Sequence, residues 1–350
     1  MNALNQTMIY TLYDYCKKWE DPAMVSAVFV KGEGKAFCAG GDVKAVTKRY
    51  KNGEKKEVLH FFKREYQLNQ LIATMRTPYV AFMDGVTMGG GAGISAHGHF
   101  RIATENTLFA MPECGLGLFT DVGATHFLTH LIRYELGLFM ALTGARIRGR
   151  DLTEIGIATH FVPSFKLPLL EERLSDIRWG GRDAEIISNL IEDIAEPHGD
   201  VELSEKTPTH PIVAHRSEII EVFMLETVEE IKEELRKRAE KGSAWSQDAY
   251  NAIDRSSPTS LKVTFEALKR ASTMSLNDSL QMEYRMLHRF MEGNDFYEGV
   301  RAILLDKDNA PVWKPDTLES VTKEMVAEYF APVEEELLFS SDSSNVKSRL

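Results

Sequence analysis

Apolar residues recur at helical spacing along several stretches of this 350-residue chain. Near the start, this spacing predicts an amphipathic helix with its apolar face at Met8, Ile9, Leu12, Tyr13, Cys16 and Trp19. A longer series predicts a helix over 58–75, which ends before Pro78 because a proline disfavours helical backbone in the residue preceding it. Three further helices are predicted on the same grounds over 121–132, 135–143 and 218–239.

Continuous apolar runs predict buried strands between these helices. The predicted strands span 25–30, 79–83, 100–104 and 107–111. Strand, helix, strand and loop follow one another repeatedly, which predicts an α/β fold of stacked ββα units. A Pro- and His-containing stretch over 196–211 has the composition of a linker, and the chain beyond it has helical patterning. We therefore predict a core over 1–210 and a C-terminal helical region over 211–350.

Composition narrows the classes of function. The formal net charge of −11 argues against broad binding to nucleic acid or to an anionic membrane. No apolar run has the length needed to span a bilayer. The three cysteines form no C-x-x-C pair, which predicts neither a metal site nor a disulfide framework.

The glycine cluster Gly89-Gly90-Gly91 follows the run at 79–83 and precedes Ile94-Ser95-Ala96, where we predict that a helix starts. Glycine lets another group approach the backbone closely because it has no Cβ atom. The first N–H groups of a helix have no partner within it, so this junction suits an oxygen that gains negative charge. For an isolated glycine triplet, a plain tight turn is the alternative.

Two other stretches favour the oxygen-binding junction over a plain turn. They are Lys35–Asp42, which is rich in glycine and other small residues, and Phe109–Gly123. Together with the glycine cluster they resemble the crotonase (enoyl-CoA hydratase/isomerase) superfamily. The stretch Phe109–Gly123 and the C-terminal segments 257–262 and 295–307 resemble its 3-hydroxyisobutyryl-CoA hydrolase subfamily. The resemblance implies a crotonase, or ClpP-like, spiral of ββα units with a C-terminal helical region. It also implies that the first N-terminal hairpin of the family is missing here.

The resemblance implies a role for several residues. Backbone N–H groups of Ala39 and Gly90 would form the oxyanion hole, and Glu113 would be the main catalytic carboxylate. Asp121 would share the active site with Glu113. From the residues alone, Glu113 can also be a solvated loop glutamate, and Asp121 can be an ordinary helix N-cap. Thr120 stands where the subfamily usually has Pro.

Substrate contacts are also implied by the resemblance. Glu65 and Gly89 would contact the acyl-CoA together with Gly90, Glu113 and Asp121, although a surface helix charge is the alternative for Glu65. The coenzyme A moiety would lie near residues of the first glycine-rich stretch and one C-terminal lysine: Lys35, Ala36, Cys38, Asp42 and Lys307. Further cations that could reach its phosphates are Lys44, Lys48, Arg49 and Arg301.

Other chemistries find little support in the sequence. No G-x-S-x-G elbow, H-E-x-x-H motif or Walker-type loop is present. His126 and His130 stand four apart without an evident carboxylate ligand, so we predict core or surface histidines. Cys114 is adjacent to Glu113, and we predict a small buried residue there rather than a thiol nucleophile.

Gly93 stands where a typical hydratase carries a second catalytic glutamate, which argues against hydration and predicts room for water or a branched acyl group. The expected function is hydrolysis of 3-hydroxyisobutyryl-CoA, or a close 3-hydroxyacyl-CoA, in valine breakdown. The alternatives are another crotonase activity, or a non-catalytic structural subunit. Coenzyme A belongs to the substrate, no separate cofactor is expected, and a homo-oligomer is left open. The resemblance implies the mitochondrial matrix, although the chain shows no targeting peptide.

Overall fold

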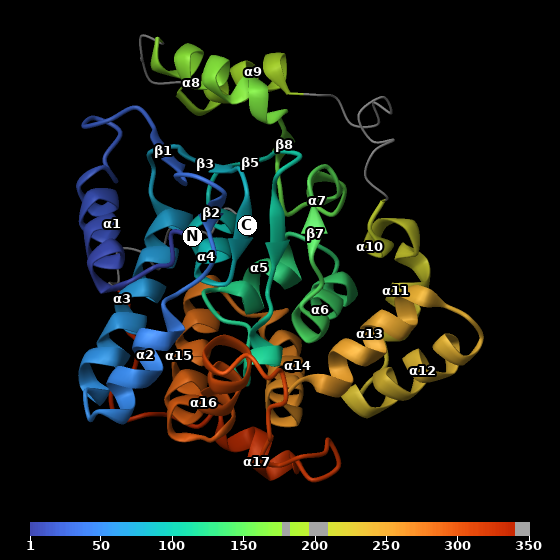
Figure 1. The fold of residues 1–350 in the computed structure, drawn as a ribbon. Helices are drawn as coiled ribbons and strands as arrows, with labels where there is room; N and C mark the ends of the chain where they lie inside the picture. The colour runs from blue at the N-terminus through green and yellow to red at the C-terminus, as the bar shows by residue number, and fades with distance from the viewer. Residues whose placement is uncertain (177–182, 196–208, 340–350) are drawn as a thin grey trace.

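The computed structural model describes residues 1–176, 183–195 and 209–339 (Figure 1). Its strands form two four-stranded sheets, with the orders β1-β3-β5-β8 and β2-β4-β6-β7. The first sheet consists of β1 Val28–Lys31, β3 Tyr79–Met83, β5 Phe100–Ala103 and β8 His160–Phe161. The second consists of β2 Ala36–Cys38, β4 Val86–Met88, β6 Leu108–Ala110 and β7 Ile147–Arg148.

From β1 to β6, consecutive strands alternate between the two sheets. Each strand pair β1β2, β3β4 and β5β6 therefore adds one strand to both sheets, and helices follow before the next pair begins. Pairing is parallel, as in Val28↔Tyr79 and Val80↔Phe100, except that β7 runs antiparallel to β6. This advance by one strand in each unit produces the predicted spiral of ββα units.

Helices surround the sheets and make up the C-terminal region of the described chain (Figure 1). Those of the first part are α1 Gln6–Lys18, α2 Val43–Lys51, α3 Lys55–Thr74, α4 Gly90–Ala96, α5 Ala124–His130, α6 Tyr134–Thr143, α7 Asp151–Glu154, α8 Leu167–Ser175 and α9 Asp183–Ile194. Those that follow are α10 Pro211–Ala214, α11 Arg216–Phe223, α12 Val228–Glu240, α13 Ala244–Arg255, α14 Pro258–Ala271, α15 Leu276–Glu292, α16 Asp295–Val300 and α17 Lys323–Glu328.

Several predicted boundaries differ from the observed ones. The helix predicted over 218–239 is two helices, α11 and α12, and Thr227 starts the second by accepting a hydrogen bond from the amide of Glu230. The helix predicted to start at Ile94 begins at Gly90, so the glycines form its first turn. A short strand, β4, separates this helix from the strand predicted at 79–83. Most of the predicted linker, residues 196–208, lies outside the described residues.

Glycines permit the close packing of α4. A Cβ atom on Gly91 would lie 2.1 Å from the carbonyl oxygen of Cys38, so this helix lies directly against β2. A Cβ atom on Gly93 would lie 2.7 Å from Val122 Cβ and 2.9 Å from Asn69 Nδ2. The room predicted beside Gly93 is therefore wrong, because Val122 and Asn69 already fill it.

One hydrophobic core runs through both predicted regions, from Leu4 to Leu337. A second cluster, which includes Val80, Phe82 and Ile102, lies between the first sheet and α8 and α9. The division at residue 210 stays a prediction, as does the missing hairpin. Within the described residues, no helix has the length and apolar character required for a membrane span.

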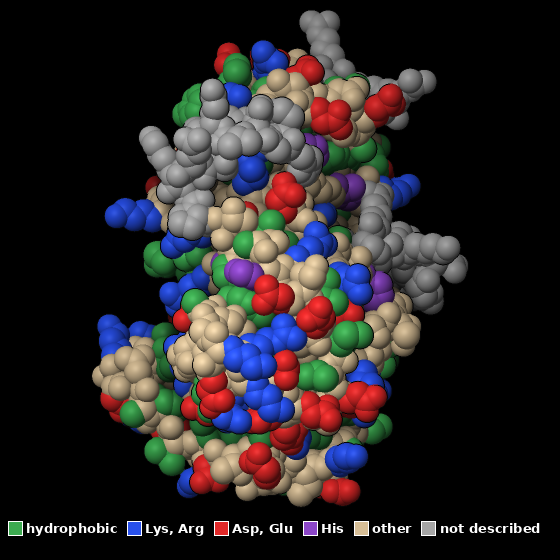
Figure 2. Space-filling model, turned by 90° about the vertical axis from the view of Figure 1, so that its right-hand side faces the viewer, with side chains coloured by type: hydrophobic (Ala, Val, Ile, Leu, Met, Phe, Trp, Pro, Cys, Tyr) green, Lys and Arg blue, Asp and Glu red, His purple; other side chains and the backbone are tan. Residues whose placement is uncertain are grey.

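Charged side chains on the face drawn in Figure 2 are mixed in sign. Lys and Arg side chains lie among Asp and Glu side chains over the described residues of this face. Such a surface offers no broad field of one sign for a polyanion. The predicted absence of nucleic-acid and membrane partners stays a prediction.

Candidate active site

A cavity of about 590 Å³ lies where the turn after β2, the start of α4 and the face of α3 meet. Six of the predicted site residues line it: Ala39, Glu65, Gly89, Gly90, Glu113 and Asp121. They come from five separate segments, so the fold brings together what the sequence keeps up to 82 positions apart. The C-terminal region closes the cavity with Arg255, Ser256, Ile303, Leu304, Asn309 and Pro311.

The glycine turn lets two carboxyl groups reach the backbone. Gly89 has a φ of +49°, and a Cβ atom there would lie 3.0 Å from Glu113 Oε1. A Cβ atom on Gly90 would lie 2.8 Å from Glu65 Oε1. Both positions therefore require glycine, because a side chain at either one would crowd a carboxyl oxygen. A plain tight turn does not account for this requirement.

The amide of Ala39 is already engaged. Its N–H donates to the carbonyl oxygen of Met1 over 3.1 Å, because residues 1–4 pair with the turn after β2. The Ala39 amide is therefore not free in this structure, and its role as an oxyanion donor stays a prediction. Gly41 N lies 3.4 Å from the position of a Cβ on Gly90, and the described structure gives its N–H no acceptor. Gly41 also lines the cavity, so its unengaged amide and that of Gly90 face the same space.

Glu113 begins the short 3₁₀ helix η1 Glu113–Leu116, directly after Pro112. The side chain is buried, and its Oε2 atom has no hydrogen-bond partner among the described residues. Burial, with Asp121 nearby, raises the pKa of this carboxyl well above its usual value. A solvated loop glutamate, the alternative from sequence, is therefore wrong.

Asp121 lies in the loop before α5. The hydroxyl of Tyr66 donates to its Oδ2 over 2.9 Å. Burial raises the pKa of Asp121 to about 7, and the Tyr66 hydrogen bond opposes this rise. The side chain of Asp121 does not cap α5, so the N-cap alternative is wrong. The N-cap position is Gly123, whose amide donates to Glu283 Oε2 over 2.7 Å.

Glu65 faces the cavity from the middle of α3. It is buried, and its pKa rises to about 8 because of burial and the nearby charge of Asp121. The surface-charge alternative is therefore wrong for this residue. Glu65, Glu113 and Asp121 form a cluster of buried carboxyls in one cavity, and their pKa values all shift upward.

The residues predicted to bind coenzyme A lie outside the set that lines the cavity. Ala36 and Cys38 are buried in β2, while Lys35 and Lys307 are exposed. Asp42 caps α2 by accepting a hydrogen bond from the amide of Ala45. These assignments stay predictions.

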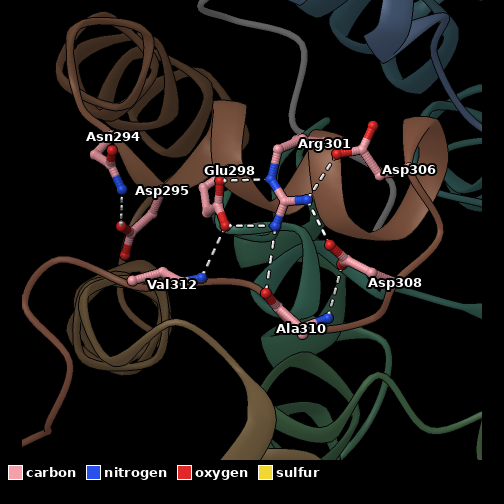
Figure 3. A network of polar contacts seen from close by, with 8 residues as sticks. All are labelled: Asn294, Asp295, Glu298, Arg301, Asp306, Asp308, Ala310 and Val312. Atoms are coloured by element: carbon pink, nitrogen blue, oxygen red, sulfur yellow. Dashed lines mark hydrogen bonds and ion pairs between the residues drawn. The ribbon is translucent and has the colours of Figure 1, made fainter.

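Arg301 was a further candidate for contacts with the phosphates of coenzyme A. Its side chain is already hydrogen-bonded within the protein. Its side chain donates to Glu298, Asp306 and Asp308 and to the carbonyl oxygen of Ala310 (Figure 3). These contacts account for all of the N–H donors of a guanidinium group. Arg301 therefore fastens residues 301–312, which we call the strap, and does not offer a free donor to a ligand.

The strap forms one wall of the cavity. It begins with the π-helical turn Arg301–Leu305, which carries the lining residues Ile303 and Leu304. Figure 3 shows how its far end returns to α16, where the amide of Val312 donates to Glu298 over 2.8 Å. π-helical turns often occur at functional sites.

Other candidate chemistries do not gain support from the geometry. The rings of His126 and His130 stack at 3.9 Å, and no cluster of metal-ligating side chains occurs among the described residues. Cys114 is buried, and its thiol donates to Thr264 Oγ1 over 3.4 Å. Burial raises the pKa of this thiol to about 12, so Cys114 is a small buried residue, as predicted.

Three residues at or near the cavity escaped the sequence analysis. Tyr66 directly follows Glu65, and this adjacency was the available signal. Gly41 lies in the glycine-rich stretch that was already singled out, but its role depends on the pairing of residues 1–4 with this turn. Glu283 lies 160 positions from the amide that it accepts, and no local pattern marks it.

Comparisons with known proteins show which family the chain belongs to. A sequence model of the family described as "Enoyl-CoA hydratase/isomerase" matches residues 1–330. The chain belongs to this family, the crotonases. Two solved structures are similar over the whole fold. The first is a carnitinyl-CoA dehydratase from Mycobacterium thermoresistibile, with a TM-score of 0.85, 36% identity and coverage of 97% of this chain and 93% of that one. The second is an enoyl-CoA hydratase from Rhodobacter sphaeroides, with a TM-score of 0.82, 33% identity and coverage of 96% and 93%.

Curated relatives narrow the family. A protein named "3-hydroxyisobutyryl-CoA hydrolase, mitochondrial" from Rattus norvegicus is 45% identical over 94% of this chain and 83% of its own length. Proteins of the same name from Danio rerio and Homo sapiens are 44% and 43% identical, covering 96% and 94% of this chain and 85% and 83% of their own lengths. This chain is therefore similar to a group of thioester hydrolases over nearly all of its length.

Proposed function

We propose that this protein hydrolyses the thioester of 3-hydroxyisobutyryl-CoA, or of a close 3-hydroxyacyl-CoA, to the free acid and coenzyme A. The names of the curated relatives support this choice of substrate. One observation in the structure carries the proposal: buried carboxyls and unengaged amides of two glycine turns share one cavity. This combination suits acyl transfer, in which a carbonyl oxygen gains charge while an acid or base acts on the same carbon.

In the proposed reaction, the amides of Gly41 and Gly90 bind the thioester oxygen. An oxyanion donor of this kind contributes about 3–4 kcal/mol to the transition state. Glu113 then acts as a carboxylate in one of two ways. It attacks the carbonyl carbon and forms an anhydride as the thiolate leaves, and water hydrolyses the anhydride. Alternatively, it takes a proton from water, which attacks the carbon directly.

Asp121 is proposed as the group that handles protons. Its pKa of about 7 lies below that of Glu113, which burial raises further, so Asp121 ionises first. An ionised Asp121 can accept the proton that Glu113 must lose before it reacts. It can also accept a hydrogen bond from the 3-hydroxyl group of the acyl chain. Glu65 and Gly89 complete the contacts with the acyl group in this proposal.

The proposed setting follows the relatives. They are named mitochondrial, and we propose the mitochondrial matrix and valine breakdown for this chain as well. Coenzyme A enters as part of the substrate, and the chemistry needs no further cofactor. Assembly with further copies of the chain is compatible with the proposal and is not required by it.

The test is release of free thiol from a panel of acyl-CoA esters by wild-type protein and the Glu113→Gln variant. We expect release from 3-hydroxyisobutyryl-CoA and a large loss in the variant. A wild-type protein that releases no thiol from any ester contradicts the proposal. The similar solved structures are a dehydratase and a hydratase, so the panel includes enoyl-CoA esters. Water addition or an isomer without thiol release would favour those activities instead.

A further inference from the structure

The environment of Asp121 assigns a role to a residue that does not line the cavity. We propose that Tyr66 is a positioning residue that holds Asp121 and makes it the ionised carboxyl of the site. This inference rests on the proposed function, because it concerns the group that handles protons there. The contact is one buried hydrogen bond, from Tyr66 Oη to Asp121 Oδ2 over 2.9 Å.

Tyr66 is held rigidly in place. Its side chain is fully buried, and its ring packs edge-on against Tyr284 and Phe62, with centroids 6.4 Å away in both cases. Burial also holds the pKa of the Tyr66 hydroxyl well above its usual value, so the group keeps its proton throughout the working range of an enzyme. Tyr66 therefore remains a donor to Asp121 at every relevant pH, and a donor favours the ionised carboxylate.

The backbone beside Asp121 is fixed as well. Val122 has a φ of +59°, which is unusual for a β-branched residue; it costs free energy and persists only where the surroundings enforce it. His97 Nε2 lies 2.9 Å from the carbonyl oxygen of Val122. On the other side, Glu283 accepts hydrogen bonds from the amide of Gly123 and from both the amide and the hydroxyl of Thr125.

The titratable groups around Asp121 come from each element packed against its loop. They are Glu65 and Tyr66 of α3, His97 at the end of α4, Glu113 of η1 and Glu283 of α15. The carboxyl groups among them oppose a charge on Asp121, and His97 is neutral at neutral pH because burial lowers its pKa to about 4. Tyr66 is the side chain among these groups that donates a hydrogen bond to the Asp121 carboxylate.

The same comparison explains why Asp121 differs from its neighbours. Glu65 Oε1 and Glu113 Oε2 are buried without any hydrogen-bond partner among the described residues. Asp121 has the Tyr66 hydroxyl, and its pKa rises less far than that of Glu113. The Tyr66 hydroxyl is thus a side-chain donor that Asp121 has and that, among the described residues, Glu65 Oε1 and Glu113 Oε2 lack.

The test is the Tyr66→Phe variant, which removes the hydroxyl and keeps the ring. Loss of a hydrogen bond to a charged group moves the acid limb of the kcat profile upward by about one to two pH units. At pH 7 we expect kcat to fall about tenfold, and at pH 9 to approach the wild-type value, with KM little changed. A fall in kcat without a shift of the limb, or no change at all, overturns the proposal.

Two controls separate this role from a structural one. Tyr284→Phe removes a hydroxyl from the ring that packs on Tyr66, and within the described residues that hydroxyl has no hydrogen bond; we expect an unchanged profile. In an Asp121→Asn background, adding Tyr66→Phe should change kcat less than twofold, because Tyr66 acts through Asp121. Additive losses in the double variant overturn the proposal.

A measurement without substrate distinguishes this proposal from the proposed function. The carboxyl of Asp121 can be titrated by ¹³C NMR in aspartate-labelled protein, with Asp121→Asn to assign the signal. We expect a higher pKa for Asp121 in Tyr66→Phe than in wild type. An unchanged pKa overturns the role of Tyr66 even if thiol release is observed. A raised pKa supports it even if every ester proves inert.

Discussion

Two groups of acidic side chains lie near the cavity and differ in their surroundings. Glu65, Glu113, Asp121 and Glu283 are buried, and among the described residues no hydrogen bond or ion pair joins them to a cation. Glu298, Asp306 and Asp308 lie on the strap and its neighbouring helix, and all of them contact Arg301. The pKa values of the first group rise because of burial, whereas those of Glu298 and Asp308 fall because of hydrogen bonds with Arg301.

The difference shows how one residue type serves two purposes. A carboxyl without a cation in a buried site exchanges protons near neutral pH, which suits chemistry. A carboxylate held by a guanidinium stays charged and fixes a loop. The strap therefore forms part of the cavity wall, and we propose that the buried cluster provides the groups that react.

Neutralising one carboxyl in each group tests the difference between the two groups most directly. We expect Glu113→Gln to lower kcat for thiol release by about 10²–10⁴-fold, the range attributed to a general acid or base. Asp308→Asn leaves the buried cluster intact and should change kcat less than twofold. Both rates are measured by the appearance of free thiol. Equal losses in the two variants would contradict the separation of roles.

The buried cluster should also oppose stability at alkaline pH. The folded protein keeps protons on Asp121 and Glu65 up to pKa values of about 7 and 8, whereas the unfolded chain releases them near pH 4. Their contribution to the free energy of unfolding is therefore fully present below pH 4 and is lost as the pH rises through 7 to 8. The strap has the opposite sign, because the lowered pKa of Asp308 contributes stability that is lost only as the pH falls below about 4.

Denaturant unfolding of wild type and Asp121→Asn between pH 5 and 8 measures this effect. The wild-type free energy of unfolding should fall relative to the variant by roughly 1.4 kcal/mol for each pH unit below the folded pKa of Asp121. Parallel curves for the two proteins would show that Asp121 does not carry a raised pKa.

Releasing the strap should have a smaller effect, mainly on binding. We expect Arg301→Met to raise KM for the acyl-CoA ester about five- to tenfold. This corresponds to a loss of about 1–1.4 kcal/mol of binding free energy. The pH profile should not move. Arg236→Met is the matched control, because Arg236 also joins two exposed glutamates, Glu233 and Glu240, but on α12 away from the cavity lining. A similar rise of KM in both variants would contradict a role of the strap in substrate binding.

The smallest effect is expected at Cys114, which tests whether burial beside Glu113 is enough to make a residue part of the chemistry. Its thiol is buried next to Glu113 but bonds to Thr264 and keeps its proton, with a pKa of about 12. Cys114→Ala should change kcat less than twofold and lower stability by about 1 kcal/mol. Rates of thiol release and thermal unfolding measure the two quantities. A loss of activity comparable to that of Glu113→Gln would make Cys114 part of the chemistry.

Local patterns predicted the elements that are long and periodic. The strand at 79–83 has the observed bounds, and the helix predicted over 58–75 is α3, Lys55–Thr74. The pattern failed where short elements depend on partners distant in sequence. Residues 36–38 were not among the predicted strands, but they pair with β4. The break between α11 and α12 is set by the cap at Thr227.

The site was predicted in outline because the resemblance supplied residues that local spacing could not connect. Glu65, Glu113 and Asp121 do share one cavity. The sequence could not show that the carbonyl of Met1 engages the amide of Ala39 and leaves that of Gly41 free, because this depends on how residues 1–4 pair with the turn. Tyr66 and Glu283 act through side-chain contacts across the fold, and sequence spacing holds no record of such contacts.

The cap that Glu283 provides has a consequence for how the enzyme is made. The loop that carries Asp121 is synthesised early, yet the carboxylate that secures it belongs to α15 and leaves the ribosome more than 150 residues later. The nascent spiral therefore holds its reactive groups in an unfinished arrangement. The arrangement around Asp121 is therefore complete only once α15 has packed against this loop.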